Sequence, residues 1–128
     1  MSHKVFVSYA SQDTSMVAKT LEKLRKWKVL SIDDEIFIDR KGISAGESFR
    51  EATRAAIGAA DTVLVIWSPA AVESKWVNYE LGMADALGKE LVIVAPRGMD
   101  QKPPIASHSF KLVELPGMFA EKGRPGAG

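Results

Sequence analysis

Two apolar runs without alternation constrain the fold of this chain more than any other feature. Residues 62–68 read Thr-Val-Leu-Val-Ile-Trp-Ser, and residues 91–95 read Leu-Val-Ile-Val-Ala. A strand with one solvent-exposed face would alternate apolar and polar side chains, so these runs predict strands that are covered on both faces. That environment is typical of a parallel sheet with helices packed on each side.

The segments around these runs predict a regular alternation of strands and helices. Three further strands are expected at Lys4–Tyr9, at Glu35–Asp39 and, as a final edge strand, at Lys111–Leu115. Amphipathic helices are expected between them at residues 13–27, 49–60 and 74–88, with Asp13 or Thr14 as the first N-cap. Right-handed crossovers then give a five-stranded, doubly wound parallel sheet, for which 2-1-3-4-5 is the common strand order.

Composition excludes several classes of function. The 128 residues suit one domain, expected at 1–116, with 117–128 as a flexible tail or the start of a linker. A net charge of +1 without a basic block gives no indication of nucleic acid or of an acidic membrane as partner. Cysteine is absent, and the two histidines stand near the N-terminus and in a Pro/Ser-rich loop, so no metal site is expected. No apolar run approaches the length of a membrane span, and a cytoplasmic location is expected.

Glu80 occupies an unusual place in the third predicted helix. On a helical wheel it falls between Leu87 and Ala84, within an apolar arc that also holds Trp76 and Leu81. A carboxylate taken out of water without partners costs several kcal/mol. Either Glu80 reaches the helix edge or a basic partner, or it is a functional carboxylate in a cleft.

Polar residues at the strand ends favour the second interpretation. In open α/β sheets, ligands bind outside the carboxyl ends of the strands. Those ends carry Ser8, Tyr9 and Ser11 after the first strand, Asp39 and Arg40 after the second, and Ser68 after the third, from which the helix of Glu80 departs. Glycine-rich phosphate motifs are missing, and no histidine lies near a serine to activate it.

A single carboxylate suits one kind of chemistry. Cleavage of a bond to a sugar anomeric carbon passes through an oxocarbenium-like state, which a nearby carboxylate stabilises. A cationic leaving group, such as nicotinamide in a ribosyl linkage, requires no general acid. The residues are therefore compatible with cleavage of a nicotinamide–ribose bond.

Five motifs together resemble the TIR (Toll/interleukin-1 receptor) domain family. They are Phe6-Val-Ser-Tyr9 with Asp13, Phe37-Ile-Asp39, Ala45-Gly-Glu-Ser48, Leu64-Val-Ile-Trp-Ser-Pro69 and Trp76-x-x-x-Glu80-Leu81. They occur in the family's order and cover the chain from about Lys4 to Leu115. The resemblance implies a flavodoxin-like fold, with Arg40–Glu47 as a loop that opens or blocks the site.

The resemblance also implies an activity. Many bacterial and plant TIR domains cleave NAD+, giving nicotinamide and ADP-ribose or a cyclic isomer, in immune-type, anti-phage signalling. It implies Glu80 as the catalytic residue, Trp76, Tyr9 and Asp39 at the nucleotide site, NAD+ as substrate rather than cofactor, and no metal. Ser8, Ser11, Arg40 and Ser44 complete the expected substrate-binding set.

The resemblance implies partners as well, and the sequence departs from the family in one informative place. Activity is expected to depend on self-association through TIR–TIR contacts that include the loop Arg40–Glu47, with a fused or separate sensor domain as a further partner. Ala10 follows Tyr9, where some NAD-cleaving members carry arginines that hold the dinucleotide. Phosphate contacts would then come from Arg40, Lys41 or a neighbouring subunit.

Two alternatives remain open at the level of sequence. A TIR domain without activity would act as a scaffold that docks other TIR domains through the same loop. A related nucleoside deoxyribosyltransferase would also depend on a glutamate, but would exchange bases on a deoxynucleoside.

Overall fold

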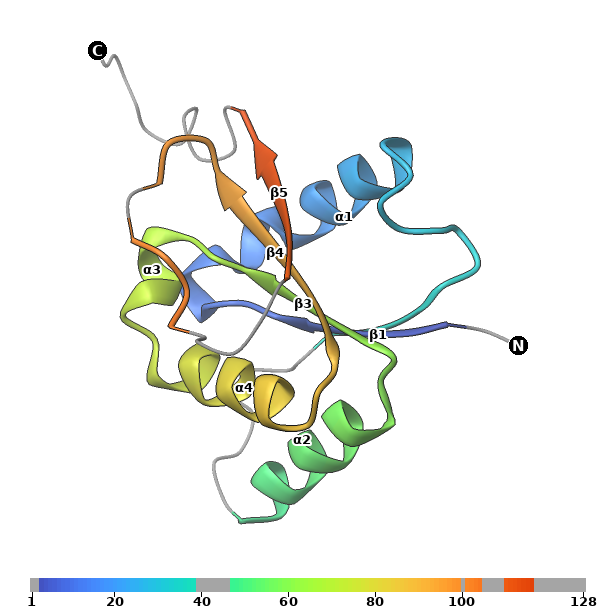
Figure 1. Cartoon of the computed structure of the whole chain (residues 1–128), viewed down its shortest axis with the longest axis vertical. Coiled ribbons are helices and arrows are strands. Elements are labelled where there is room, and N and C mark those ends of the chain that lie inside the picture. The colour runs from blue at the N-terminus through green and yellow to red at the C-terminus, as the bar shows by residue number, and fades with distance from the viewer. Residues whose placement is uncertain (1–2, 39–46, 100, 105–109, 117–128) are drawn as a thin grey trace.

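The computed structural model describes residues 3–38, 47–99, 101–104 and 110–116, and Figure 1 shows their arrangement. Its centre is one sheet of five parallel strands in the order β2-β1-β3-β4-β5. The strands are β1 (Lys4–Ser8), β2 (Glu35–Ile38), β3 (Thr62–Ile66), β4 (Glu90–Pro96) and β5 (Lys111–Leu115). The prediction of a doubly wound sheet with this order, and with the fifth strand at an edge, is confirmed.

Helices cover both faces of the sheet. A 3-10 segment, η1 (Ser11–Met16), leads into α1 (Val17–Lys26) on one face. The other face carries α2 (Glu47–Ala59), the short α3 (Pro69–Val72) and α4 (Lys75–Ala86). Figure 1 shows α1 on one side of the strands, with α2 and α4 next to each other on the opposite side.

Strand β3 shows why its sequence is apolar without alternation. Leu64 and Ile66 pack into the cluster under α1, whereas Val63 and Val65 pack into the cluster under α2 and α4. All four side chains are buried. Successive strand residues point to opposite faces, so a strand that is covered on both sides is apolar along its middle, and its polar residues lie at its ends.

Two helix starts differ from the sequence prediction. Neither Asp13 nor Thr14 caps α1, because η1 intervenes and α1 begins after Met16 without a side-chain cap. The carboxylate of Asp13 instead accepts a hydrogen bond from Ser68, which lies 55 residues away in the sequence. The unexpected helix α3 begins directly after β3, because the Ser68 hydroxyl accepts the backbone N–H of Ala71 and a proline follows at the first helical position.

Several expectations fall on residues outside the described ranges. They concern Asp39, Arg40 and Ser44, the loop Arg40–Glu47 apart from its last residue, His108, and the tail at 117–128. Within the part of the chain that the structure describes, no helix is both long and apolar enough to span a membrane.

Candidate active site

Glu80 lies at the contact between α4 and the carboxyl end of β1. Its side chain is fully buried, and Oε1 accepts a hydrogen bond of 2.5 Å from the hydroxyl of Ser8, the last residue of β1. Ser8 is also fully buried, and 72 residues separate the two in sequence. The structure therefore brings together two of the residues that the sequence proposed for the site.

The start of α4 fixes the rotation of the helix that carries Glu80. The helix begins where the sequence predicted, with Ser74 as its N-cap, and the Ser74 hydroxyl accepts the backbone N–H of Val77 at 3.1 Å. The Asn78 side-chain amide donates to the carbonyl oxygens of Ala71, Val72 and Ser74 at 3.3, 3.2 and 2.8 Å. These contacts hold α3 against the first turns of α4.

The buried face of α4 is rotated relative to the arc that the helical wheel predicted. Val77, Glu80, Leu81 and Ala84 are buried, whereas Leu87 is 52% exposed and forms the C-cap. Glu80 thus lies at the border of the buried face and not at its middle. That border faces β1. The Glu80 carboxyl group can therefore be buried and still reach the polar residues at the carboxyl ends of the strands.

A second serine–carboxylate pair lies at the same edge of the sheet. The Ser68 hydroxyl, after the end of β3, donates to Asp13 Oδ2 at 2.5 Å, and both residues are buried. Sequence reasoning did not assign Asp13 to the site. The sequence does place Asp13 soon after the end of the first strand, where site residues are expected. Its polar side chain was interpreted as a helix cap and not as a site residue.

The remaining predicted residues take different positions. Tyr9 is buried in the cluster under α1, on the face of the sheet opposite to α4. Ser11 is exposed at the start of η1, where its carbonyl accepts the Thr14 hydroxyl. Trp76 is half-buried in the first turn of α4, with its ring centroid 5.1 Å from that of Tyr79.

A cavity of about 450 Å³ lies beside Trp76, between α2 and α4. Its described lining residues are three cations and two aromatic residues: Arg50, Arg54, Lys75, Trp76 and Tyr79. The two arginines stand four residues apart on α2, a pattern that the sequence shows but that its interpretation left unused. Because α2 and α4 begin at the carboxyl edge of the sheet, this cavity lies at the same edge as Glu80.

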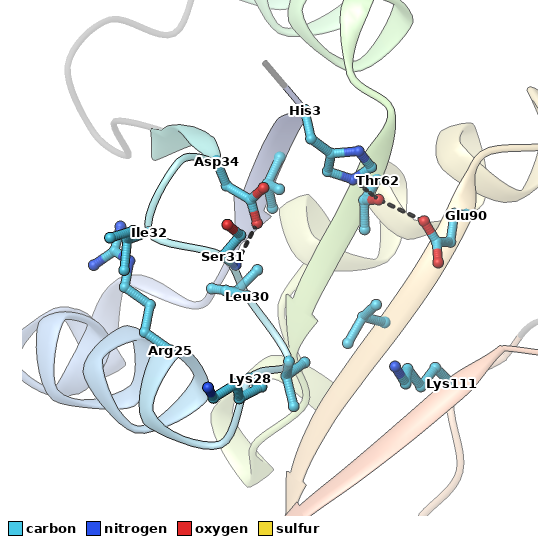
Figure 2. A pocket seen from close by; sticks show the side chains of 13 residues that line it. His3, Arg25, Lys28, Leu30, Ser31, Ile32, Asp34, Thr62, Glu90 and Lys111 are labelled. Carbon is cyan, nitrogen blue, oxygen red and sulfur yellow. Dashed lines mark hydrogen bonds between the residues drawn. The ribbon is translucent and has the colours of Figure 1, made fainter. Parts of the chain in front are cut away.

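A larger cavity, of about 600 Å³, lies at the opposite edge (Figure 2). There His3 Nε2 and Thr62 Oγ1 lie 2.7 Å apart, and the Thr62 hydroxyl donates to Glu90 Oε1 at 2.7 Å. These residues stand at the amino ends of β1, β3 and β4, whereas Glu80 meets the carboxyl end of β1. The size of this cavity therefore does not make it the candidate active site.

The described residues contain no group of three or more histidine, aspartate or glutamate side chains that could hold a metal. The site is therefore defined by a buried carboxyl group, its serine partner and an adjacent cationic, aromatic cavity. These groups lie at the carboxyl ends of the strands, which is where open α/β sheets bind ligands.

The family follows from a comparison of the sequence. Residues 5–122 match the TIR domain family, and the chain belongs to that family. A search of curated proteins found no significant relative.

Solved structures with similar folds come from several kinds of protein. The TIR domain of the Toll-related receptor TRR-2 from Hydra magnipapillata superposes with a TM-score of 0.60 at 18% identity, covering 84% of this chain and 82% of that one. A 2-deoxyribosyltransferase from Leishmania mexicana gives 0.54 at 20% identity, with 86% and 81% covered. The TIR domains of the Roq1 resistosome, which recognises the pathogen effector XopQ, give 0.56 at 22% identity, with 75% and 58% covered.

Proposed function

We propose that this TIR domain cleaves the nicotinamide–ribose bond of NAD+, with Glu80 as the catalytic carboxylate. The observation that supports this most directly is the place of Glu80: a buried carboxyl group at the carboxyl edge of the sheet, hydrogen-bonded to Ser8. A glutamate in a helix that served only packing would be replaceable by leucine without loss. Retaining a buried carboxyl group is expected where its charge or its oxygen atoms are used.

The chemistry requires little beyond this group. As the bond between C1′ and nicotinamide breaks, its electron pair neutralises the pyridinium nitrogen and positive charge develops on the ribose. A carboxylate near C1′ stabilises that charge, and in a site from which water is excluded the stabilisation is larger than in water. Water, or another atom of the same molecule, then attacks C1′ and releases a proton, which gives ADP-ribose or a cyclic isomer.

The burial of Glu80 bears on how activity would be controlled. A fully buried carboxyl group cannot touch a substrate, so catalysis requires the surroundings of Glu80 to open. We propose that self-association provides this opening, since TIR domains occur together in the Roq1 resistosome. Turnover per chain should then rise with protein concentration, and a rate proportional to concentration from nanomolar to high micromolar would contradict this step.

The direct test compares wild type with Glu80→Gln at high protein concentration with a crowding agent. Chromatography of the products should show nicotinamide and an ADP-ribose species for wild type, and at least a hundredfold less (about 2.7 kcal/mol of lost stabilisation) for the variant. Glu73→Gln, which removes an exposed carboxylate just before α4, is the matched control and should retain activity. Equal nicotinamide release by wild type and Glu80→Gln would refute the proposal.

The scaffold alternative is favoured by the same burial, because a structural carboxyl group would also be enclosed and hydrogen-bonded. Under that alternative, Glu80→Ala would leave TIR–TIR association intact, and a loop change such as Gly46→Pro would abolish it. Light scattering on both variants, together with the NAD+ assay, separates the two functions.

A deoxyribosyltransferase function is the third candidate, supported by the similarity of fold to the enzyme from Leishmania mexicana. Base exchange on a deoxynucleoside without turnover of NAD+ would identify it. The match of residues 5–122 to the TIR family favours the NAD+ assay as the first experiment.

A further inference from the structure

The cavity between α2 and α4 combines charge and aromatic surface in an unusual way for this chain. Arg50 and Arg54 come from α2, and Lys75, Trp76 and Tyr79 come from α4. The described lining includes no carboxylate, although the whole chain carries 17 basic and 16 acidic residues. Three cations around one cavity of about 450 Å³ are therefore a local feature and do not reflect a generally basic protein.

These cations are unfavourable for the helices that carry them. Arg50 lies in the first turn of α2, and Lys75 is the first residue of α4, where the helix dipole already places positive charge. Arg50 and Arg54 also stand one turn apart on the same side of α2, an arrangement in which like charges repel. Glu47 and Glu51 each stand three residues before one of the arginines, a spacing that offsets part of this repulsion along α2. An anion bound in the cavity would offset it for all three cations together.

The chemistry of the lining indicates the class of ligand. The guanidinium group of arginine binds phosphate oxygens through paired, charge-assisted hydrogen bonds, and the N-terminus of a helix also favours a bound phosphate. The Trp76 and Tyr79 rings, 5.1 Å apart and tilted by 32°, add an aromatic wall against which a planar base can pack. Phosphate and a planar base together define a nucleotide.

The position of the cavity relates it to Glu80. Trp76 precedes Glu80 by four residues on the same helix, which is a rise of about 6 Å. The carboxyl end of β1 supplies no cation, because its residues Ser8, Tyr9 and Ala10 carry no positive charge. Glu80 does not itself line the cavity, so a dinucleotide with its glycosidic bond at Glu80 would have to extend past Trp76 to bring its phosphates against α2.

We propose that Arg50, Arg54 and Lys75 form the subsite for the phosphates of the nucleotide substrate, with Trp76 and Tyr79 as its aromatic wall. This inference rests on the proposed NAD+ cleavage and adds to it a binding role for α2 that the family resemblance did not supply. The three cations are binding groups, and Glu80 remains the group at the reacting bond.

The test uses the double variant Arg50→Glu/Arg54→Glu, because both side chains are exposed and their replacement should preserve folding. The KM for NAD+ should rise roughly tenfold or more, as expected for the loss of charge-assisted contacts, while kcat changes by less than about twofold. Arg54→Gln should give a smaller rise. Lys19→Glu, an exposed charge reversal on α1, is the control and should leave KM unchanged.

A second measurement does not depend on turnover. ADP-ribose and nicotinamide riboside, which lacks phosphate, are titrated into ¹⁵N-labelled Glu80→Gln protein with and without the arginine changes. ADP-ribose should bind at least about tenfold more weakly to the protein with changed arginines, and nicotinamide riboside equally to both. Size-exclusion chromatography with light scattering is run alongside, because a variant that lost assembly and kept its affinity for ADP-ribose would overturn the inference.

The outcomes separate this inference from the proposed function. If wild type cleaves NAD+ and Glu80→Gln does not, unchanged KM and ADP-ribose affinity in the arginine variant overturn the phosphate subsite alone. If wild type cleaves no NAD+, the proposed function fails, and the ADP-ribose titration still decides the subsite. Wild-type protein that shows no binding of ADP-ribose, or binding that the arginine changes leave intact, overturns it.

Discussion

The hydrogen bond between Ser8 and Glu80 allows stability and function to be separated by experiment. Ser8→Ala removes a hydroxyl donor 2.5 Å from the Glu80 carboxyl group, at a position where neither side chain is exposed. Removing one partner of a buried hydrogen bond costs about 1–3 kcal/mol, and water cannot easily replace that partner here. The free energy of unfolding should fall by about 2 kcal/mol, and the midpoint of thermal unfolding by roughly 6–10 °C for a domain of this size.

Replacing both partners should behave differently. In Ser8→Ala/Glu80→Leu both partners of this hydrogen bond are replaced by apolar side chains of similar volume, so the double variant should be at least as stable as wild type. It should nevertheless release no nicotinamide from NAD+. Stability that is gained while activity is lost would show that the carboxyl group is retained for chemistry at the expense of stability.

The assay is urea unfolding of wild type, both single variants and the double variant, followed by circular dichroism and analysed as a double-mutant cycle. Ser15→Ala, an exposed serine of η1, is the control and should change stability by less than about 0.5 kcal/mol. A change that small for Ser8→Ala would refute the hydrogen-bond argument. A double variant that is less stable than wild type by more than about 2 kcal/mol would show that Glu80 is structural.

Two other predictions concern hydrogen bonds to backbone carbonyl oxygens and the backbone conformation of one residue. Asn78→Ala removes three hydrogen bonds to carbonyl oxygens and should lower the free energy of unfolding by about 1–2 kcal/mol. It should also reduce kcat, because these contacts hold the helix that carries Glu80. An unaltered kcat would show that they do not position Glu80. Lys28 has a φ of 64°, a conformation that glycine adopts without strain, so Lys28→Gly should stabilise the chain by roughly 0.5–1 kcal/mol. Lys23→Gly, at an exposed position inside α1, should destabilise it by a similar amount, and equal effects of the two changes in thermal unfolding would contradict the argument.

The strands and most of the helices could be predicted from the sequence because their signals are local. Uniform apolar runs indicate burial on both faces, and alternating strands and helices restrict the sheet to few topologies. The start of α4 near Ser74 and the edge strand at Lys111–Leu115 followed from the same rules. The 3-10 segment η1 did not, because Asp13 fits a helix cap equally well until its distant partner Ser68 is known.

The candidate site divides in the same way. The sequence by itself determined that Glu80 lies on a largely apolar arc of a helix that leaves the third strand, and that polar residues end the neighbouring strands. Only the tertiary structure decided that this arc turns toward β1, so that Glu80 meets Ser8, and that Arg50 and Arg54 lie across a cavity from Trp76. Periodicity gives the approximate face of an element that is buried, whereas its exact rotation and the residue met on the facing element depend on how crossover helices pack on the sheet.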